Sequence, residues 1–142
     1  MGDTPLHLAA YKGHEGVIRF LIKKGALVNV EDYSRLTPIH LAAGSGHLAT
    51  VRLLIEMHAS IDTTDHNGQT PLHLAAQWDR EAVVRLLISE VASIEAKDKD
   101  GRTPIHLAAN RGIGSIVVCV SQWTPVEELT FCWQKLMATQ AW

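Results

Sequence analysis

The chain has 142 residues, of which 46% are hydrophobic, and this is enough for the buried core of one compact or one elongated domain. Its formal net charge of −2, from 13 basic and 15 acidic residues, excludes a global electrostatic attraction to nucleic acid. The longest uninterrupted apolar run, residues 116–120, is far too short to span a bilayer, so no membrane partner is expected.

The cysteine content and the first residues favour an intracellular location. Cys119 and Cys132 are too few for a disulfide framework, and a reducing compartment is the simpler interpretation. No basic segment followed by an apolar one opens the chain, so we expect no secretory signal. The predicted location is the cytoplasm or the nucleus.

One seven-residue segment occurs four times. Its copies, each Thr-Pro-Leu/Ile-His-Leu-Ala-Ala, span residues 4–10, 37–43, 70–76 and 103–109, which gives a constant period of 33 residues. A fixed period of this size is typical of a solenoid, in which each unit buries its apolar face only by stacking on its neighbours. The segment itself predicts the start of a short helix, because threonine is a favoured N-cap and proline suits the first helical position. The sequence therefore predicts an all-α repeat solenoid.

In repeat one, a second and longer helix is expected over residues 15–24. Val17, Ile18, Leu21 and Ile22 fall at one-face helical spacing, and Phe20 broadens this apolar side. Gly25 is expected to end this helix in the left-handed cap position. The polar segment 30–36 then leads to the next threonine and is predicted to form a projecting, β-hairpin-like loop.

Repeats two and three copy this plan, with second helices expected over residues 48–57 and 81–90. The position of Gly25 is taken by His58 and then by Val91, where a β-branched residue costs roughly 1–2 kcal/mol if the left-handed geometry is kept. The alternative is that this turn relaxes. Gly68 and its equivalent in repeat four are expected at positive φ, although repeat two has Arg35 in that position.

Repeat four keeps its first helix, and its second is expected over residues 114–121. Beyond residue 122 the period ends. Residues 123–142 form a separate tail, in which Thr124, Pro125 and Glu127 predict the start of a helix over residues 125–139. Three interpretations remain open: this tail would cap the end of the stack, dock on another domain, or be sequence foreign to the repeat domain.

The repeats resemble those of the ankyrin-repeat family, whose period is 33 residues and whose signature is Thr-Pro-Leu-His-x-Ala. The resemblance covers residues 2–121 and leaves out the tail. It implies ankyrin-type helix-turn-helix repeats with projecting β-hairpin loops, as a four-repeat stack over residues 1–122 whose first and last repeats are incomplete. It also implies a non-catalytic role in protein–protein recognition on the concave face.

The histidine at the fourth place of each segment is the most conspicuous chemical group. His7, His40, His73 and His106 lie on separate helices, without the two-per-helix spacing of a metal site. We expect each ring to hydrogen-bond backbone of adjacent turns and to tie the repeats together. No nucleophile motif and no phosphate-binding loop accompanies them. The sequence therefore predicts no enzyme activity, no metal, no cofactor and no small-molecule substrate.

The positions that vary between repeats flank the loop turn, precede the threonine or follow the paired alanines. In the ankyrin geometry they would line one continuous concave strip. Aromatic and arginine side chains dominate interface energetics, so Tyr33, Trp78 and Arg111 are expected to contribute most. The predicted partner-binding residues are Tyr11, Lys12, Tyr33, Ser34, Leu36, His66, Asn67, Gln69, Gln77, Trp78, Lys99, Arg102, Asn110 and Arg111.

Two functions follow from these observations. The first is a binding module that holds a protein partner, and not nucleic acid, on the concave strip. The second is a regulatory or assembly fragment of a larger enzyme, channel or adaptor, in which Trp123, Trp133 and Trp142 of the tail pack on a neighbouring domain.

Overall fold

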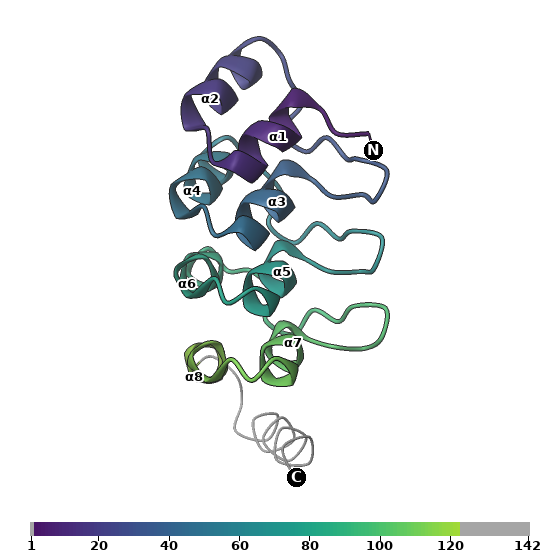
Figure 1. Cartoon of the computed structure of the whole chain (residues 1–142), viewed down its shortest axis with the longest axis vertical. Helices are drawn as coiled ribbons and strands as arrows, with labels where there is room; N and C mark the ends of the chain where they lie inside the picture. Colours follow the sequence, from purple (N-terminus) through teal and green to yellow (C-terminus); the bar gives the residue numbers. More distant parts are fainter. Residues whose placement is uncertain (1, 123–142) are drawn as a thin grey trace.

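The computed structural model describes residues 2–122, and within them it contains eight α-helices and no β-strand (Figure 1). The helices are α1 (Pro5–Lys12), α2 (Glu15–Lys23), α3 (Pro38–Ser45), α4 (Leu48–Glu56), α5 (Pro71–Gln77), α6 (Glu81–Ser89), α7 (Pro104–Asn110) and α8 (Gly114–Ser121). The predicted all-α repeat solenoid is confirmed. The tail predicted over residues 123–142, with its helix, lies outside the described residues.

The helices form two rows. The inner row consists of α1, α3, α5 and α7, the outer row of α2, α4, α6 and α8, and each repeat contributes one antiparallel pair (Figure 1). Repeats one to four are therefore the pairs α1–α2, α3–α4, α5–α6 and α7–α8. The long loops ahead of α3, α5 and α7 all project to the same side, beyond the inner row (Figure 1).

The inner helices pack on one another through their small residues. Both alanines of the repeated segment are buried in repeats one, two and three, so neighbouring inner helices approach closely. The outer helices contribute the larger apolar side chains of the core, such as Ile18, Leu54 and Leu87, which are fully buried. Burial of such a side chain stabilises the fold by about 1.5–3 kcal/mol.

Each inner helix begins with a threonine N-cap, and the histidine three residues later closes the cap from the other side. In repeat one, the His7 backbone N–H donates to Thr4 Oγ1 at 3.4 Å, and the Thr4 backbone N–H donates to His7 Nδ1 at 3.1 Å. This is a capping box in which histidine takes the place that glutamate or glutamine usually holds. The sequence predicted the role of the threonine but not that of the ring nitrogen.

The projecting loops are tight turns organised by one buried or half-buried aspartate each. Asp32, Asp65 and Asp98 are 33 residues apart, and Oδ1 of each accepts two backbone N–H groups at 2.8–2.9 Å. Backbone bonds such as that from the Asp32 N–H to the Leu36 carbonyl, at 3.0 Å, give these turns the form of hairpins. The loops also join each other, because the His66 N–H donates to the Ser34 carbonyl at 2.9 Å.

The left-handed turns after the outer helices are kept even where glycine is absent. Gly25 has φ 97°, and its counterparts His58 and Val91 have φ 67° and 66°. The alternative of a relaxed turn is therefore wrong, and Val91 stays in a strained region of backbone space. In the loop ahead of α3, Arg35 likewise has a positive φ, of 60°. Gly68, at the same position of the next loop, has φ 73°.

The apolar side of α2 is only partly buried. Ile18 is fully buried and Leu21 and Ile22 are half-buried, but Val17 and Phe20 are exposed at 48% and 58%. The reason is that among residues 2–122 no helix pair lies on the side of α2 that faces away from α4. In the same part of the chain, no helix has the length and apolarity needed to cross a membrane.

Candidate functional site

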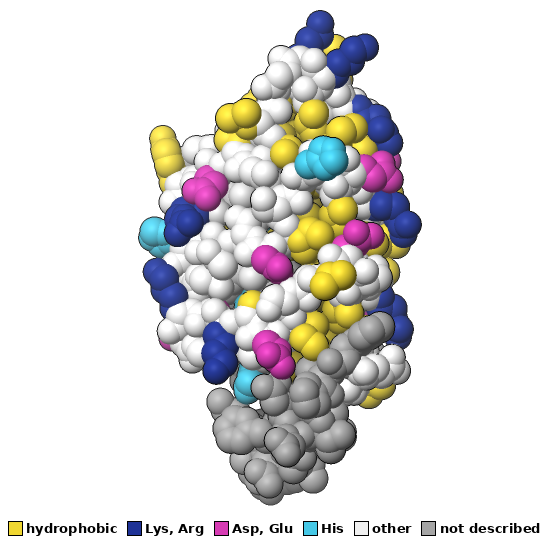
Figure 2. Space-filling view, turned by 180° about the vertical axis from the view of Figure 1, so that it is seen from behind, with side chains coloured by type: hydrophobic (Ala, Val, Ile, Leu, Met, Phe, Trp, Pro, Cys, Tyr) yellow, Lys and Arg dark blue, Asp and Glu magenta, His cyan; other side chains and the backbone are white. Residues whose placement is uncertain are grey.

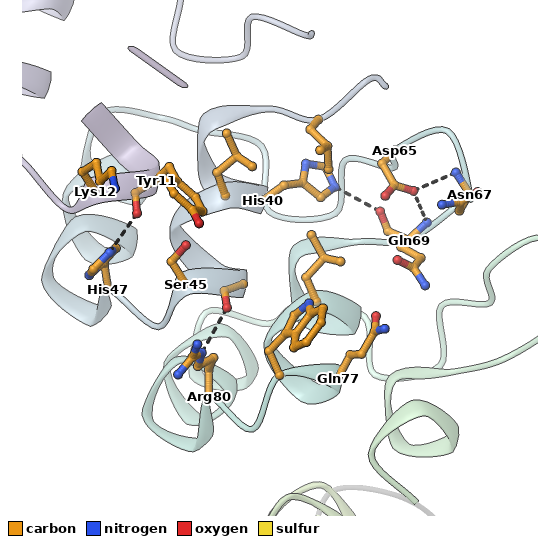
Figure 3. Close-up of a pocket in the computed structure, with 15 residues that line it drawn as sticks. Tyr11, Lys12, His40, Ser45, His47, Asp65, Asn67, Gln69, Gln77 and Arg80 are labelled. Carbon is orange, nitrogen blue, oxygen red and sulfur yellow. Dashed lines mark hydrogen bonds between the residues drawn. The ribbon is translucent and has the colours of Figure 1, made fainter. Parts of the chain in front are cut away.

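A groove of about 840 Å³ runs along the inner row of helices, beneath the projecting loops (Figure 3). It crosses repeats one, two and three, so no single repeat could form it alone. Its lining residues are Tyr11, Lys12, Leu36, His40, Leu41, Gly44, Ser45, His47, Asp65, Asn67, Gln69, Leu74, Gln77, Trp78 and Arg80.

The groove exists because repeat two has its smallest side chains where the neighbouring repeats have large ones. Gly44 occupies the position of Tyr11, and Ser45 occupies the position of Lys12 and Trp78. Tyr11 and Trp78 are exposed at 50% and 47%, and they stand on either side of this gap. An apolar surface between two half-exposed aromatic rings is suited to the side chain of another macromolecule.

The Trp78 ring forms part of the floor and wall of the gap. Its Cδ1 atom lies 3.7 Å from the place where a Cβ on Gly44 would be, and the Leu74 Cβ lies 3.6 Å from that place. The guanidinium carbon of Arg111 lies over the Trp78 ring, 4.4 Å from its centroid. Trp78 and Arg111 also line a second hollow of about 390 Å³ next to the groove. Trp78 is thus shared between two adjoining concavities.

Two bonds between repeats hold the walls of the groove in place. His47 Nε2–H donates to the Tyr11 carbonyl at 2.9 Å, and Arg80 Nε–H donates to the Gly44 carbonyl at 3.0 Å (Figure 3). His47 and Arg80 occupy the same position of successive repeats. These two contacts could not be predicted from the sequence, because nothing in one repeat shows that its turn reaches the helix of the repeat before.

The buried histidines tie the repeats together, as predicted. Nε2–H donates to the backbone carbonyl ahead of the next inner helix at 2.8 Å for His7, 3.0 Å for His40 and 2.9 Å for His73. The acceptors are the carbonyls of Leu36, Gln69 and Arg102. Since Nδ1 accepts the threonine N–H and Nε2 must donate, the network requires the neutral ring.

Burial has a direct electrostatic consequence for two of these rings. Desolvation lowers the pKa of His40 and of His73, although the carbonyl bond and the nearby aspartates oppose it. His40 lines the groove, but both of its ring nitrogens are engaged within the fold. The ring therefore serves to build the groove and is not a free base for acid–base chemistry.

The loop ahead of α5 places two amide side chains at the edge of the groove. Asp65 accepts the backbone N–H groups of Asn67 and Gln69, both at 2.9 Å, and thereby fixes the loop (Figure 3). The equivalent Asp98 in the next loop is only 7% exposed and pairs with Arg102 Nε at 3.0 Å. Its burial is possible because the carboxylate receives these donors.

The structure brings some of the predicted partner-binding residues together and separates others. Those that line the groove are Tyr11, Lys12, Leu36, Asn67, Gln69, Gln77 and Trp78, of which Gln69 is largely buried. Those outside it are Tyr33, Ser34, His66, Lys99, Arg102, Asn110 and Arg111. The side chain of Arg102 is occupied by Asp98 and Asp100, and Tyr33 is 80% exposed beside Gly2.

Several residues of the groove were not found from the sequence. Leu41 and Leu74 occupy one repeating position, one turn before the predicted aromatic positions, and they are half-buried in the groove. Their repetition marked them as scaffold. The spacing of 3.6 residues could have placed them on the same helical face as Ser45 and Trp78.

The described residues offer little for covalent or metal chemistry. Among residues 2–122, no group of three or more histidine, cysteine, aspartate or glutamate side chains could hold a metal ion. Cys119 is a buried free thiol, and burial raises its pKa, which disfavours the nucleophilic thiolate.

A family model described as "Ankyrin repeats (3 copies)" matches residues 1–65, 29–98 and 57–120. The chain belongs to the ankyrin-repeat family. The predicted resemblance is therefore confirmed, and the stacked pairs, histidine ties and projecting loops are those of an ankyrin-repeat stack. Ankyrin repeats are generally protein–protein interaction modules, and their domains are typically non-catalytic.

Proposed function

We propose that this ankyrin-repeat chain is a non-catalytic module that binds a protein partner in the groove on its concave, loop-lined side. One observation carries the proposal, namely the gap over Gly44 between the half-exposed rings of Tyr11 and Trp78. Exposed aromatic rings that flank an apolar concavity are the usual anchors of protein interfaces. The amides of Asn67 and Gln77 at the edge supply hydrogen bonds to a partner's backbone or side chains.

The charges near the groove favour a protein over nucleic acid. Among residues 2–122, the Lys12 ammonium lies 5.4 Å from the Tyr11 ring centroid and forms no salt bridge, so it can meet an acidic group. In contrast, Arg80 is bound to a carbonyl and Arg102 is paired with two aspartates. With a net charge of −2 for the chain, these few cations do not make the broad basic surface that nucleic-acid binding requires.

The test fills the gap without unfolding the stack. A Cβ on Gly44 would meet only ordinary contacts at 3.6 and 3.7 Å, and alanine is favoured over glycine inside a helix. Gly44→Ala is therefore the matched control, and Gly44→Phe fills the space between the rings. Proteins captured by crosslinking from cell extract should be retained by Gly44→Ala and lost with Gly44→Phe.

A second pair of variants addresses the rings themselves. Tyr11→Ala combined with Trp78→Ala should abolish the same capture, while Val118→Ala, at an exposed apolar position of α8, should leave it intact. A hot-spot residue loses roughly 2 kcal/mol or more of binding energy on truncation. Capture that is unchanged by both Gly44→Phe and the double variant would remove the concave groove as the binding site.

A further inference from the structure

The exposed charges that line the groove have one sign. Lys12 of repeat one and Arg80 of repeat three are both exposed there, and Arg80 keeps its positive charge although its Nε–H donates to a carbonyl. The lining residues include one carboxylate, that of Asp65, which is 7% exposed and accepts two backbone N–H groups. None of the four inner helices of the described chain contains an acidic residue. The surface that a partner meets in the groove is therefore apolar and positive.

This single sign is not a general property of the molecule. Figure 2 shows a face on which acidic and basic side chains are interspersed. The whole chain has a formal net charge of −2, with 15 acidic and 13 basic residues. A groove whose one carboxylate is buried therefore discriminates by charge among the segments of a partner, because an acidic side chain is attracted to it and a basic side chain is repelled.

The hollow next to the groove continues this positive charge into repeat four. It is lined by Gln77, Trp78, Asp79, Arg111 and Ile113. The guanidinium of Arg111 lies over the Trp78 ring, and a guanidinium in such a position still has N–H donors at its edge that suit a carboxylate. Among residues 2–122, Arg111 forms no salt bridge, either with Asp79 or with any other carboxylate. Its charge is therefore available to a partner.

The repeat geometry sets the spacing between the apolar gap and this cation. The gap over Gly44 lies on α3, whereas Arg111 directly follows α7, two inner helices further along the stack. Packed helices are about 8–10 Å apart, so the two features are separated by roughly 16–20 Å. An extended chain advances about 3.3 Å per residue, and about five or six residues therefore span this distance.

We propose that the partner binds through an extended acidic segment, in which an apolar side chain fills the gap over Gly44 and a carboxylate about five or six residues away pairs with Arg111. This inference rests on the proposed function of the groove and adds the chemistry of the partner. The carboxylate accepts two parallel N–H bonds from the guanidinium, which is the geometry that arginine favours. Trp78 takes part in both contacts, because it borders the gap and also lies under the guanidinium.

A library of random peptides displayed on phage tests the proposal with the full chain. Peptides of about 12 residues are long enough to reach from the gap to Arg111. The peptides that the chain retains should contain an apolar residue and, about five or six positions away, an aspartate or glutamate. Their affinity for the chain should fall as the salt concentration rises, because salt screens an exposed ion pair.

Three variants locate the two contacts. Gly44→Phe should abolish binding of the selected peptides, and Arg111→Gln should weaken it about tenfold, because hydrogen bonds to a charged group are lost. Arg52→Gln, which removes the same charge from the exposed face of α4, should leave the affinity unchanged. Replacing the acidic residue of a selected peptide by its amide should cost about tenfold with the original chain and almost nothing with Arg111→Gln, because the two groups act as a pair.

The contrary outcomes are distinct from one another. Selected peptides that lose binding with Gly44→Phe but not with Arg111→Gln would overturn this inference and leave the groove as the binding site. No retained peptide, or binding that survives Gly44→Phe, would overturn the extended segment, while the capture of proteins from cell extract decides the function of the groove separately. A peptide with phosphoserine in place of its acidic residue that binds at least about tenfold more tightly through Arg111 would assign this site to a phosphate and contradict the carboxylate.

Discussion

The three junctions between repeats differ on their two sides. On the loop side the same bond recurs at each junction, from His7, His40 or His73 to the carbonyl ahead of the next inner helix. On the turn side a side-chain donor joins only the first two junctions, through His47 and Arg80. At the third junction this position is Ile113, whose side chain has no hydrogen-bond donor.

This difference shows that the two sides of a repeat are under different constraints. The loop side contains buried polar groups that must be paired in every copy, because an unpaired buried group costs about 1–3 kcal/mol. The turn side is exposed, and water can replace a missing donor there. The polar residues of the loop side can therefore not be replaced without a large loss of stability, whereas the residues of the turn side tolerate replacement.

The largest loss of stability at a junction is expected from the removal of one histidine ring on the loop side. His40→Ala leaves the Thr37 N–H and the Gln69 carbonyl without their partner and opens a cavity, so we expect a loss of at least about 3 kcal/mol in the free energy of unfolding. Urea denaturation measures it. The same change at His106, which is only half-buried, should cost less, and equal losses would contradict this account.

Acid should weaken the same side without any mutation. The pKa values of His40 and His73 are lowered by burial in the folded chain, so below the unfolded value of about 6.5 the unfolded chain binds more protons. Stability should be full above pH 6.5 and fall as the pH decreases below it, by up to about 1.4 kcal/mol per pH unit for each ring. Urea midpoints between pH 7.5 and 5 report this, and a flat profile would contradict it.

Two glycines of the loops test the contacts between neighbouring repeats. Gly68 and Gly101 have φ 73° and 74°, but a Cβ on Gly68 would lie 3.1 Å from the Lys99 backbone nitrogen, while on Gly101 it meets nothing within 4 Å. Gly101→Ala should cost about 1 kcal/mol from the backbone conformation, and Gly68→Ala about 2 kcal/mol or more. Thermal unfolding compares them. Equal losses would show that the loop contact is unimportant.

The smallest expected effect belongs to the turn side. Arg80→Ile makes the second junction resemble the third and removes the donor to the Gly44 carbonyl, so we expect a loss of about 0.5–1.5 kcal/mol. Urea denaturation measures the change, and Arg85→Ile on the exposed face of α6 is the control. A loss as large as that of His40→Ala would mean that both sides of the junction are equally important.

The repeated half of the fold was predictable from the sequence, because Thr, Pro and the 33-residue period specify where each inner helix begins. The histidine ties were predictable for the same reason. The second role of the histidine in the capping box was not, since Glu or Gln is the usual signal. The turn at Val91 remained undecided, because local propensity opposes the left-handed geometry that the neighbouring repeats enforce.

The candidate site was only partly predictable. The variable positions pointed to Tyr11 and Trp78, but the gap between them depends on Gly44 being set between two neighbouring repeats. A pattern within one repeat does not show such a gap. The exposure of Val17 and Phe20 was unpredictable for a similar reason, since helical spacing identifies an apolar face and not whether anything covers it.

The histidine ties have an evolutionary consequence. Their acceptors are the main-chain carbonyls of Leu36, Gln69 and Arg102, three residues with unrelated side chains. Mutation at these places leaves the acceptor atom untouched, so the chemistry displayed beside the concavity is free to diversify while the joint beneath it stays the same. Selection for a new ligand and selection for a durable scaffold therefore act on different atoms of the same amino acid.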